Sequence, residues 1–472
     1  MHRAGLCLAV SLLAASLPSV ASAQAGSPDV PAGDATKPAD EPATRIESVP
    51  STPEERIHDL ERRLRALETK RADTRGAAES KGLEQKALER SPDKGIAVAY
   101  GPEGVGIASA DGKFQFRFRP LVQADARIFI DDGTTTFLVR RARPTMEGTA
   151  FEYFDWALVP ELTQSPSVLD AFLNIRLFRE IQLRGGKFKP PVGFERLMAA
   201  ADLPFLERGL PTNLVPSRDI GVELHGDVLG GTLVYAGGIF NGAGDGVDGN
   251  SDNNDKKDLA GRIMLHPFQP TFVTALRKLG IGIAATRGTH TGELPAYRTP
   301  VQTPFFQYVD GVTAGGTHRR IAPQASFYLG PVGLFGEYTR STLIVVRPGQ
   351  SARLNNDAWQ VVASVFLTGE EASPTTVTPK RALNPRNFGT GAVELVARYG
   401  ELKIDDDAFR LGLADATQSA RRATDWGAGV NWHMARNFKW MIDFEHTSFS
   451  GGGANGDRPS EIVFLSRFQA AY

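Results

Sequence analysis

The feature that most constrains the fold of this chain is an alternation of apolar and polar residues that recurs from about residue 110 to the end. Near the C-terminus, Ile462, Phe464 and Phe468 share one parity, whereas Arg467 and Gln469 fall on the other. A period of two places the first set on one face of a β-strand and the second set on the opposite face. We therefore expect a protein built from strands with one apolar and one polar face.

The same alternation occurs in other segments. Its apolar members include Phe114, Phe116, Phe118, Val122, Ala124, Ile128, Trp359, Val361, Ala363, Val365, Phe438, Trp440, Ile442 and Phe444. The intervening positions are rich in charged residues, which suits a water-filled interior better than the exterior of a soluble sandwich. The predicted strands are sixteen, near 113–130, 136–149, 152–163, 168–178, 180–189, 217–229, 231–241, 257–268, 278–288, 319–330, 332–343, 357–368, 389–402, 424–434, 437–447 and 461–472.

The links between these strands differ in length. Short links such as Gly230-Gly231 and Gly330-Pro331 alternate with long polar ones, at 242–256, 289–318, 344–356, 369–388, 403–423 and 448–460. We interpret them as short turns on one rim and long loops on the other, which is typical of outer-membrane barrels. Sixteen strands leave a channel that side chains cannot fill. The expected fold class is all-β, a 16-stranded antiparallel transmembrane β-barrel, with a large soluble β-protein as the alternative.

The N-terminus predicts export. Residues 1–23 combine a short basic start, an apolar run and the small residues Ala21, Ser22 and Ala23, which is typical of a cleaved signal peptide. The only cysteine, Cys7, lies inside this segment, so the mature chain would have no disulfide and no thiolate ligand. The expected location is the outer membrane of a Gram-negative cell. The aromatic C-terminal residue, Tyr472, agrees with that location because such barrels commonly end on an aromatic.

Two segments separate the signal from the barrel. Residues 24–52 are rich in Ala, Pro, Asp, Glu and Ser and are predicted to be a disordered linker. Residues 53–90 are predicted to form a coiled-coil helix. Its seam consists of Ile57, Leu60, Leu64 and Leu67, in a 3-4-3 spacing, and two R-h-x-x-h-E motifs are typical of three-stranded coiled coils. A solvated single helix is the alternative. We treat residues 91–110 as a further linker and 111–472 as the barrel.

Other motifs favour neither catalysis nor a bound cofactor. The net charge of −1 gives no support for nucleic-acid binding. The segment 244–249 fits G-x-G-x-x-G without a phosphate-binding helix after it. The Asp-rich loop at 245–258 begins like a calcium-binding loop, but Asn253 and Leu259 replace its required Gly and Glu. Loose Ca²⁺ binding and a solvated loop both stay open, and we expect no enzyme, no cofactor and no resident metal.

The link at 190–216 is long and yet apolar, unlike an ordinary exposed loop. If it folds into the barrel, its apolar side can lean on the wall while Glu195, Arg196, Glu207 and Arg208 face the pore. The sequence therefore predicts a constriction loop at this position.

An ordered set of motifs across residues 114–242 resembles the family of phosphate-selective porins O and P. The matching segments are 116–127, 137–144, 147–148, 153–155, 186–193, 207–208, 210–216, 218–221 and 238–242, and the later strands match only in general character. The resemblance implies a homotrimer of sixteen-stranded barrels in outer-membrane lipid. It also implies that each pore has an arginine ladder leading to a basic constriction.

The resemblance also implies roles for individual residues. The constriction residues would be Arg140, Arg141, Arg196 and Arg208, with Lys187, Lys189 and Arg218 nearby, Asp170 as a counter-charge, and Arg117, Arg119 and Arg127 as the pore-lining ladder. Guanidinium groups stay charged and offer forked donors to oxyanions, so a series of them can replace an anion's water shell stepwise. In a regular strand the adjacent Arg140 and Arg141 would point to opposite faces, so the alternative for one of them is a position at the membrane interface or against a neighbouring subunit. A charged lumen without selectivity is the alternative.

The expected function is passive diffusion of small anions, with inorganic phosphate or a related oxyanion as cargo. Residues 198–201 are Met-Ala-Ala-Ala, where members of the family tend to have small hydroxyl or amide residues, so the identity of the anion stays open. Alternatives are a general porin with weak anion preference and a structural or adhesive barrel. A barrel protease or lipase would need a catalytic cluster that the sequence does not show.

Overall fold

The computed structural model describes residues 95–130, 133–163, 165–250 and 254–472. The predicted signal peptide (1–23), the linker at 24–52 and the coiled-coil segment at 53–90 lie outside the described residues. The prediction of a sixteen-stranded antiparallel barrel is confirmed. Its strands are β3 (Gln115–Phe129), β4 (Thr136–Ala150), β5 (Phe154–Glu161), β6 (Ser167–Arg176), β7 (Gln182–Phe188), β8 (Asp219–Val228), β9 (Leu233–Phe240), β10 (Asp258–Leu265), β11 (Gly280–Glu293), β14 (Thr313–Leu329), β15 (Val332–Arg347), β16 (Gln350–Phe366), β17 (Ala392–Lys403), β18 (Ala420–Ala435), β19 (Phe438–Gly453) and β21 (Glu461–Ala471).

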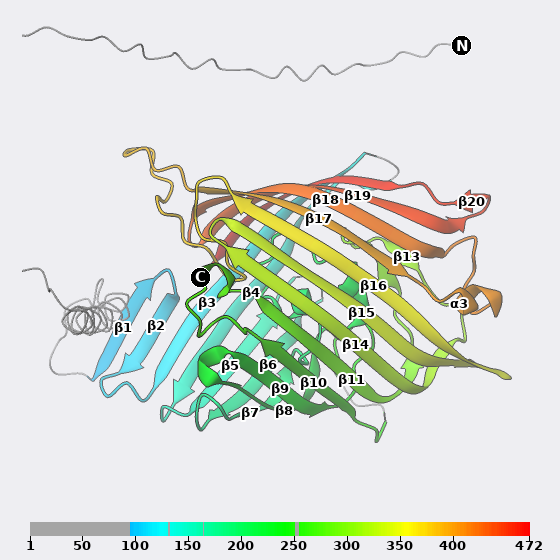
Figure 1. The fold of residues 1–472 in the computed structure, drawn as a ribbon, viewed down its shortest axis with the longest axis horizontal. Helices are drawn as coiled ribbons and strands as arrows, with labels where there is room; N and C mark the ends of the chain where they lie inside the picture. The colour runs from blue at the N-terminus through cyan, green and yellow to red at the C-terminus, as the bar shows by residue number, and fades with distance from the viewer. Residues whose placement is uncertain (1–94, 131–132, 164, 251–253) are drawn as a thin grey trace, which may run out of the picture. The chain divides into compact units, whose positions relative to one another are not determined.

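Each barrel strand pairs antiparallel with the next, and the last strand closes the sheet on the first (Figure 1). The closing register places Arg467 of β21 opposite Asp125 of β3 and Ala471 opposite Leu121. The start of β3 and the end of β21 therefore lie on the same rim of the barrel. We call it the C-terminal rim because the chain ends there. A closed sheet leaves no unpaired edge, as a strand-built membrane protein requires.

The two faces of the wall follow the alternation in the sequence. In β16, Leu354, Ala358 and Val362 face inward and are buried, whereas Trp359 and Val361 face outward and are exposed. Aromatic residues gather on the outer face near the C-terminal rim, where Trp440 stacks on Phe468 (ring centroids 5.2 Å apart) and Phe438 meets Tyr472. Such a belt is typical of the boundary between lipid and water.

No helix in the described part of the chain is long and apolar enough to cross a bilayer.

The prediction of short turns on one rim and long loops on the other is wrong for two links. Successive antiparallel strands alternate in direction, so the long link 367–391, after β16, lies on the C-terminal rim together with the short turns. The second exception is 344–356. There the β15–β16 ladder continues to the pair Arg347 and Gln350, leaving only Pro348 and Gly349 as the turn. Gly349 has φ of 76°, a conformation that glycine adopts without strain.

A hairpin precedes the barrel. Strands β1 (Ile96–Gly101) and β2 (Gly104–Ser109) pair with each other, and β2 pairs with the first residues of β3. These residues belong to the segment 91–110, which is predicted from the sequence to be a linker. The apolar side chains of β1 are exposed, so the hairpin extends the sheet without enclosing a core.

Two loops fold into the barrel and fill part of its interior. The first, 189–218, contains α2 (Phe194–Leu197) and a 3-10 helix at Leu210–Leu214. The second, 294–312, contains the short strands β12 (Tyr297–Arg298) and β13 (Pro304–Phe306). Their apolar side chains form the main buried cluster together with the inner faces of the long strands β15 and β16. Members of this cluster are Leu210, Leu214, Tyr297, Phe305, Phe306, Leu343, Val345 and Leu354. The short helix α3 (Asp406–Arg410) lies in the link after β17 and packs on the same cluster.

Candidate functional site

A cavity of about 400 Å³ lies between β4 and the two inward loops. Its charged lining consists of Arg140, Arg141, Arg196, Arg208, Arg298, Glu207 and Asp245, and its neutral lining includes Thr212, Asn213, Thr299 and Gln302. All four arginines that the resemblance assigns to the constriction are thus brought to one cavity. Arg298, from the loop 294–312, was not anticipated because that loop was expected to be a polar surface link.

Glu207 lies at the centre of this basic region. Arg140 donates to its carboxylate through Nε at 2.5 Å and Nη2 at 3.2 Å, and Arg141 donates through Nη2 at 3.0 Å. Arg127 and Arg467 reach the same carboxylate at 3.3 Å and 3.2 Å. Burial opposes its ionisation, but the four guanidiniums outweigh burial and hold the pKa of Glu207 well below its usual range. Glu207 is therefore a permanent anion inside an arginine cluster.

The expectation that Arg140 and Arg141 point to opposite faces is wrong. The β3–β4 register shifts at this point, so that Gln123 pairs with Arg141 but Ala124 pairs with Val139. Arg140 is the extra residue of a β-bulge, and a bulge lets neighbouring side chains leave the strict alternation. Both guanidiniums consequently reach Glu207 and line the same cavity.

Arg467 is a further member of the cluster and was not among the predicted site residues. It is fully buried and donates to both oxygens of Asp125, at 2.6 Å and 2.7 Å, besides its contact with Glu207. A further bond runs to the carbonyl oxygen of Leu206 in the inward loop. Its inward parity in the last strand was visible in the sequence. Its position beside Asp125 follows only from closure of the barrel.

The inward loop 189–218 is attached to the opposite wall by carboxylates. Glu337 of β15 accepts the backbone N–H of Phe194 at 2.7 Å, and Asp443 of β19 accepts that of Leu206 at 2.7 Å. Glu195, which we expected to face the pore, is fully buried and accepts from Gln360 at 2.9 Å. The loop therefore covers the carboxylates of Glu337 and Asp443 and leaves its arginines facing the cavity.

Arg196 and Arg208 are held by carbonyl oxygens. Arg208 donates to the carbonyls of Glu195 and Met198 at 3.1 Å and 2.7 Å, and Arg196 donates to that of Thr212 at 2.6 Å. Burial and the neighbouring Arg196 lower the pKa of Arg208 to about 9. Burial and Arg218 lower the pKa of Arg196 to about 10. Both stay cationic at neutral pH, and an anion in the cavity would relieve their repulsion.

Within the described residues, the guanidiniums of Arg196 and Arg208 form no ion pair, and that of Arg298 donates to the carbonyl of Gln302. Their positive charge is therefore not neutralised by a direct ion pair, although Glu207 and Asp245 line the same cavity. Guanidiniums without a carboxylate in contact, on a cavity wall, are what an anion site requires.

The remaining predicted residues lie around the cavity without lining it. Lys189 donates to the carbonyls of Leu197 and Met198, and Lys187 contacts Asn250 and the carbonyl of Val168. Asp170 lies 3.5 Å from Arg218. These contacts leave Lys187, Lys189 and Arg218 as supporting charges.

The expected ladder on β3 is discontinuous. Arg127 belongs to the Glu207 cluster, whereas Arg119 pairs with Glu147 at 3.2 Å and donates to the terminal carbonyl of Tyr472 near the C-terminal rim. Arg117 lies one step closer to that rim, beside the β1–β2 hairpin. Between Arg119 and Arg127 the same face carries Leu121, Gln123 and Asp125.

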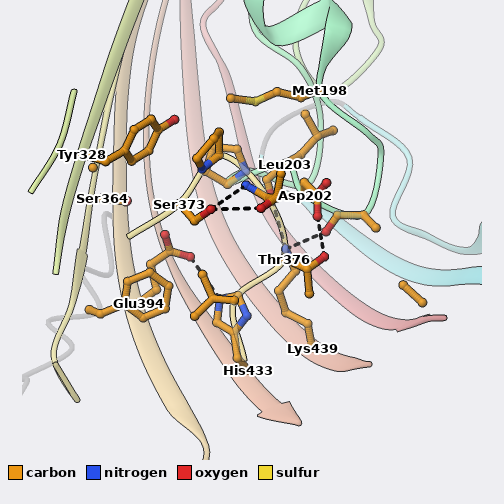
Figure 2. Close-up of a pocket in the computed structure, with 18 of the residues that line it drawn as sticks. Met198, Asp202, Leu203, Tyr328, Ser364, Ser373, Thr376, Glu394, His433 and Lys439 are labelled. Atoms are coloured by element: carbon orange, nitrogen blue, oxygen red, sulfur yellow. Dashed lines mark hydrogen bonds and ion pairs between the residues drawn. The ribbon is translucent and has the colours of Figure 1, made fainter. Parts of the chain in front are cut away.

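A smaller cavity, of about 50 Å³, lies between the inward loop and the long link 367–391 (Figure 2). Thr376 of that link donates to Asp202 of the inward loop at 2.6 Å. Glu394 and His433 form a pair at 3.1 Å on the strand wall. The link thus enters the barrel from the C-terminal rim and meets the inward loop there.

The Asp-rich loop at 245–258 uses two of its carboxylates internally. Asp245 accepts from Arg320 at 2.6 Å and from Ser341 at 2.7 Å, and Asp258 lies 2.9 Å from His290. In the part of the chain that the structure describes, no group of three or more His, Cys, Asp or Glu residues is arranged to hold a metal ion.

Comparison with known proteins gives a consistent result. A family model described as phosphate-selective porin O and P matches residues 114–450. Porin O of Pseudomonas aeruginosa is 21% identical over 368 residues, which are 70% of this chain and 82% of that protein. The outer membrane channel DcaP of Acinetobacter baumannii aligns with a TM-score of 0.51 at 9% identity, over 76% of this chain and 97% of that one. An anion-selective porin from Comamonas acidovorans aligns with a TM-score of 0.49 at 11% identity, over 76% and 100% of the two chains.

Proposed function

This chain belongs to the phosphate-selective porin O and P family and is an outer-membrane porin, and we propose that it conducts small anions, with phosphate or a related oxyanion as cargo, through the arginine-lined cavity. The observation that carries this proposal is the set of five arginines on one cavity of about 400 Å³. Three of them, Arg196, Arg208 and Arg298, donate to carbonyl oxygens and form no ion pair within the described residues.

The chemistry of the site is stepwise replacement of an anion's water shell. Arginine presents a planar fork of donors that matches the spacing of oxyanion oxygens and cannot lose its proton at neutral pH. The amide of Gln302 adds a neutral donor, because it has a second N–H besides the one donated to the carbonyl of Pro300, whereas the hydroxyl of Thr212 donates to the carbonyl of Gly209. Conduction also requires release, and several sites of moderate strength release an ion more easily than one strong site.

The burial of three carboxylates near the inward loop also favours anions over cations. Glu337, Asp443 and Glu195 are engaged by backbone amides or by Gln360 and are buried. A permeating ion therefore meets guanidiniums rather than these carboxylates. Repulsion of cations and attraction of anions follow from Coulomb's law in a low-dielectric passage.

We also propose a homotrimer, with residues 53–90 as a trimerising coiled coil and residues 1–23 as a cleaved signal. Support for the trimer comes from the lengths of the strands. A tilted membrane strand needs about 9–11 residues to cross a bilayer, but β5, β7, β9 and β10 have only 8, 7, 8 and 8 residues. Contact with another copy would cover this low side of the wall.

The test is the reversal potential of purified channels in planar bilayers, under gradients of potassium chloride and then potassium phosphate. We expect selectivity for anions, and block of the chloride current by phosphate. Arg208→Ala should weaken the block roughly tenfold to a hundredfold, because a hydrogen bond from a charged donor contributes about 1.5–3 kcal/mol. Arg422→Ala is the matched control, since Arg422 pairs with Glu401 and is exposed.

An ohmic, weakly selective current that phosphate does not block would instead indicate a general porin. One observation favours that second function: Glu207 neutralises part of the arginine cluster. Block that is equal in the wild type and in Arg208→Ala would contradict the proposed site.

A further inference from the structure

We propose that the carboxylate of Glu207 occupies the oxyanion position of the arginine cluster and exchanges with the permeating anion, so that it weakens binding and speeds release. This inference rests on the proposed function, because it names the group against which the cargo competes.

The geometry around Glu207 is that of a bound oxyanion. Four arginines converge on one carboxylate from β3, β4 and β21. Arg140 contacts both oxygens, Arg141 contacts one of them, and the other is shared with Arg127 and Arg467. Forked contacts of this kind are how arginine recognises phosphate as well as carboxylate. The donors are therefore already arranged for an oxyanion, and the chain supplies one itself.

The cluster carries a net positive charge, so it can bind an anion in place of Glu207. Arg127, Arg140, Arg141 and Arg467 carry four positive charges, whereas Asp125 and Glu207 carry two negative ones, leaving a net charge of +2. Asp125 is tied by two bonds to Arg467 and lies away from the cavity lining. Glu207 does line the cavity. It is thus the one anion of this cluster that an incoming oxyanion can displace.

The backbone on either side of Glu207 is fixed, so the exchange would be a rotation of its side chain. The N–H of Leu206 is held by Asp443 at 2.7 Å, and the carbonyl of Glu207 accepts from Arg398 at 2.9 Å. The N–H of Gly209 is held by Glu195 at 2.8 Å, and a Cβ added at Gly209 would lie 1.8 Å from the Gln360 side chain. The anchored loop keeps Glu207 tethered beside the cluster after displacement.

A tethered competitor has a predictable effect. The site can bind cargo only while the carboxylate is turned away, so the apparent affinity falls by the fraction of time that the site is free. When Glu207 returns, it takes over the guanidiniums that the anion leaves. Binding is therefore weaker and residence shorter than the arginine count alone would produce, which favours flux over retention.

The experiment measures block of single-channel chloride current by inorganic phosphate in the full-length channel. We expect Glu207→Gln to lower the half-blocking phosphate concentration at least tenfold and to lengthen individual blocking events. Glu207→Asp keeps the charge but shortens the side chain by one methylene. We expect it to lower the half-blocking phosphate concentration by less than Glu207→Gln does. Glu401→Gln is the matched control, because Glu401 also pairs with an arginine but on the outer face.

Folding of each variant is checked by the slower migration that an unfolded barrel shows on gels after heating. A folded Glu207→Gln channel with unchanged or weaker block would overturn the inference and leave Glu207 a structural partner of the arginines. If Glu207→Gln does not fold, unchanged block in Glu207→Asp overturns it equally. Failure of the proposed function is distinguishable, since the wild type would then lack anion selectivity in its reversal potential.

Discussion

Arg467 is fully buried between two carboxylates that lie far from it in the sequence, Asp125 and Glu207. A buried guanidinium is stable only when its charge is paired and its donors are satisfied. Arg467 therefore joins the last strand, the first strand and the inward loop into one electrostatic unit. The same unit holds the arginines of the cavity in position.

Replacing Arg467 by alanine should destabilise the folded barrel by about 3–5 kcal/mol, because it leaves two buried carboxylates without this partner. The measurement is the urea midpoint of unfolding in lipid vesicles. Arg422→Ala, which removes an exposed ion pair, should shift the free energy of unfolding by less than about 1 kcal/mol. Equal midpoints for Arg467→Ala and the wild type would contradict the role assigned to Arg467.

The ionisation of Glu207 should give a pH-dependent contribution to stability. Its pKa in the folded state lies well below the ordinary value of 4.5, so the contribution is present above pH 4.5 and is lost as pH falls toward the folded value. The difference in unfolding free energy between the wild type and Glu207→Gln should be constant from pH 8 to about pH 5 and should shrink at lower pH. A difference that is the same at pH 7 and at pH 3.5 would contradict the ion-pair geometry.

At the scale of elements, the links carry more of the function than the strands. The inward loops 189–218 and 294–312 supply Arg196, Arg208 and Arg298 to the cavity. The long link 367–391 enters from the C-terminal rim and contacts the inward loop through Thr376 and Asp202. The pore is therefore narrowed from both rims, which the lengths of the links alone did not indicate.

Replacing residues 373–377 by two glycines should raise the single-channel conductance, because these residues line the small cavity beneath the inward loop. Anion selectivity should stay close to that of the wild type, since the arginine cavity lies elsewhere. The same replacement at 270–274, on a link of the same rim where Phe272 is almost fully exposed, is the control. Unchanged conductance in the first variant would show that the link does not restrict ion flow.

At the scale of the whole barrel, the wall has a low side and a high side (Figure 1). Strands β14, β15, β16, β18 and β19 have 16–17 residues, whereas β5 to β10 have 7–10. A wall too short for the bilayer is expected to be shielded by protein. This asymmetry is the structural support for the proposed trimer.

Leu173→Arg, on the outer face of the low side, should convert the assembly to monomers while the barrel itself still folds. An arginine at mid-membrane costs about 2–4 kcal/mol on a lipid-exposed face, and in a packed contact between copies it would also have to fit a space that holds a leucine. Val430→Arg, on the high side, is the control and should impair insertion without changing the oligomeric state. Light scattering of detergent-solubilised protein measures that state. An unchanged trimer in Leu173→Arg would place the interface elsewhere.

Individual residues show how far prediction from sequence could reach. The parity of Phe464 and Arg467 predicted correctly which face of the last strand is polar. The alternation failed at Arg140 and Arg141, because a bulge changes side-chain direction without leaving a mark in the hydrophobic pattern. Glu195 and Glu207 looked equivalent in the sequence, but Glu195 accepts from Gln360 and from the N–H of Gly209, whereas Glu207 is held by arginines.

The sequence by itself determined the number and order of the strands and the two faces of the wall. These properties are local, because period-two alternation and turn residues act over a few positions. Only the tertiary structure decided which charges meet. Closure brought Arg467 to Asp125, a register shift turned Arg140 and Arg141 to one side, and folded loops placed Glu207 among four arginines. Charge pairing across a barrel depends on distances in space that no local pattern encodes.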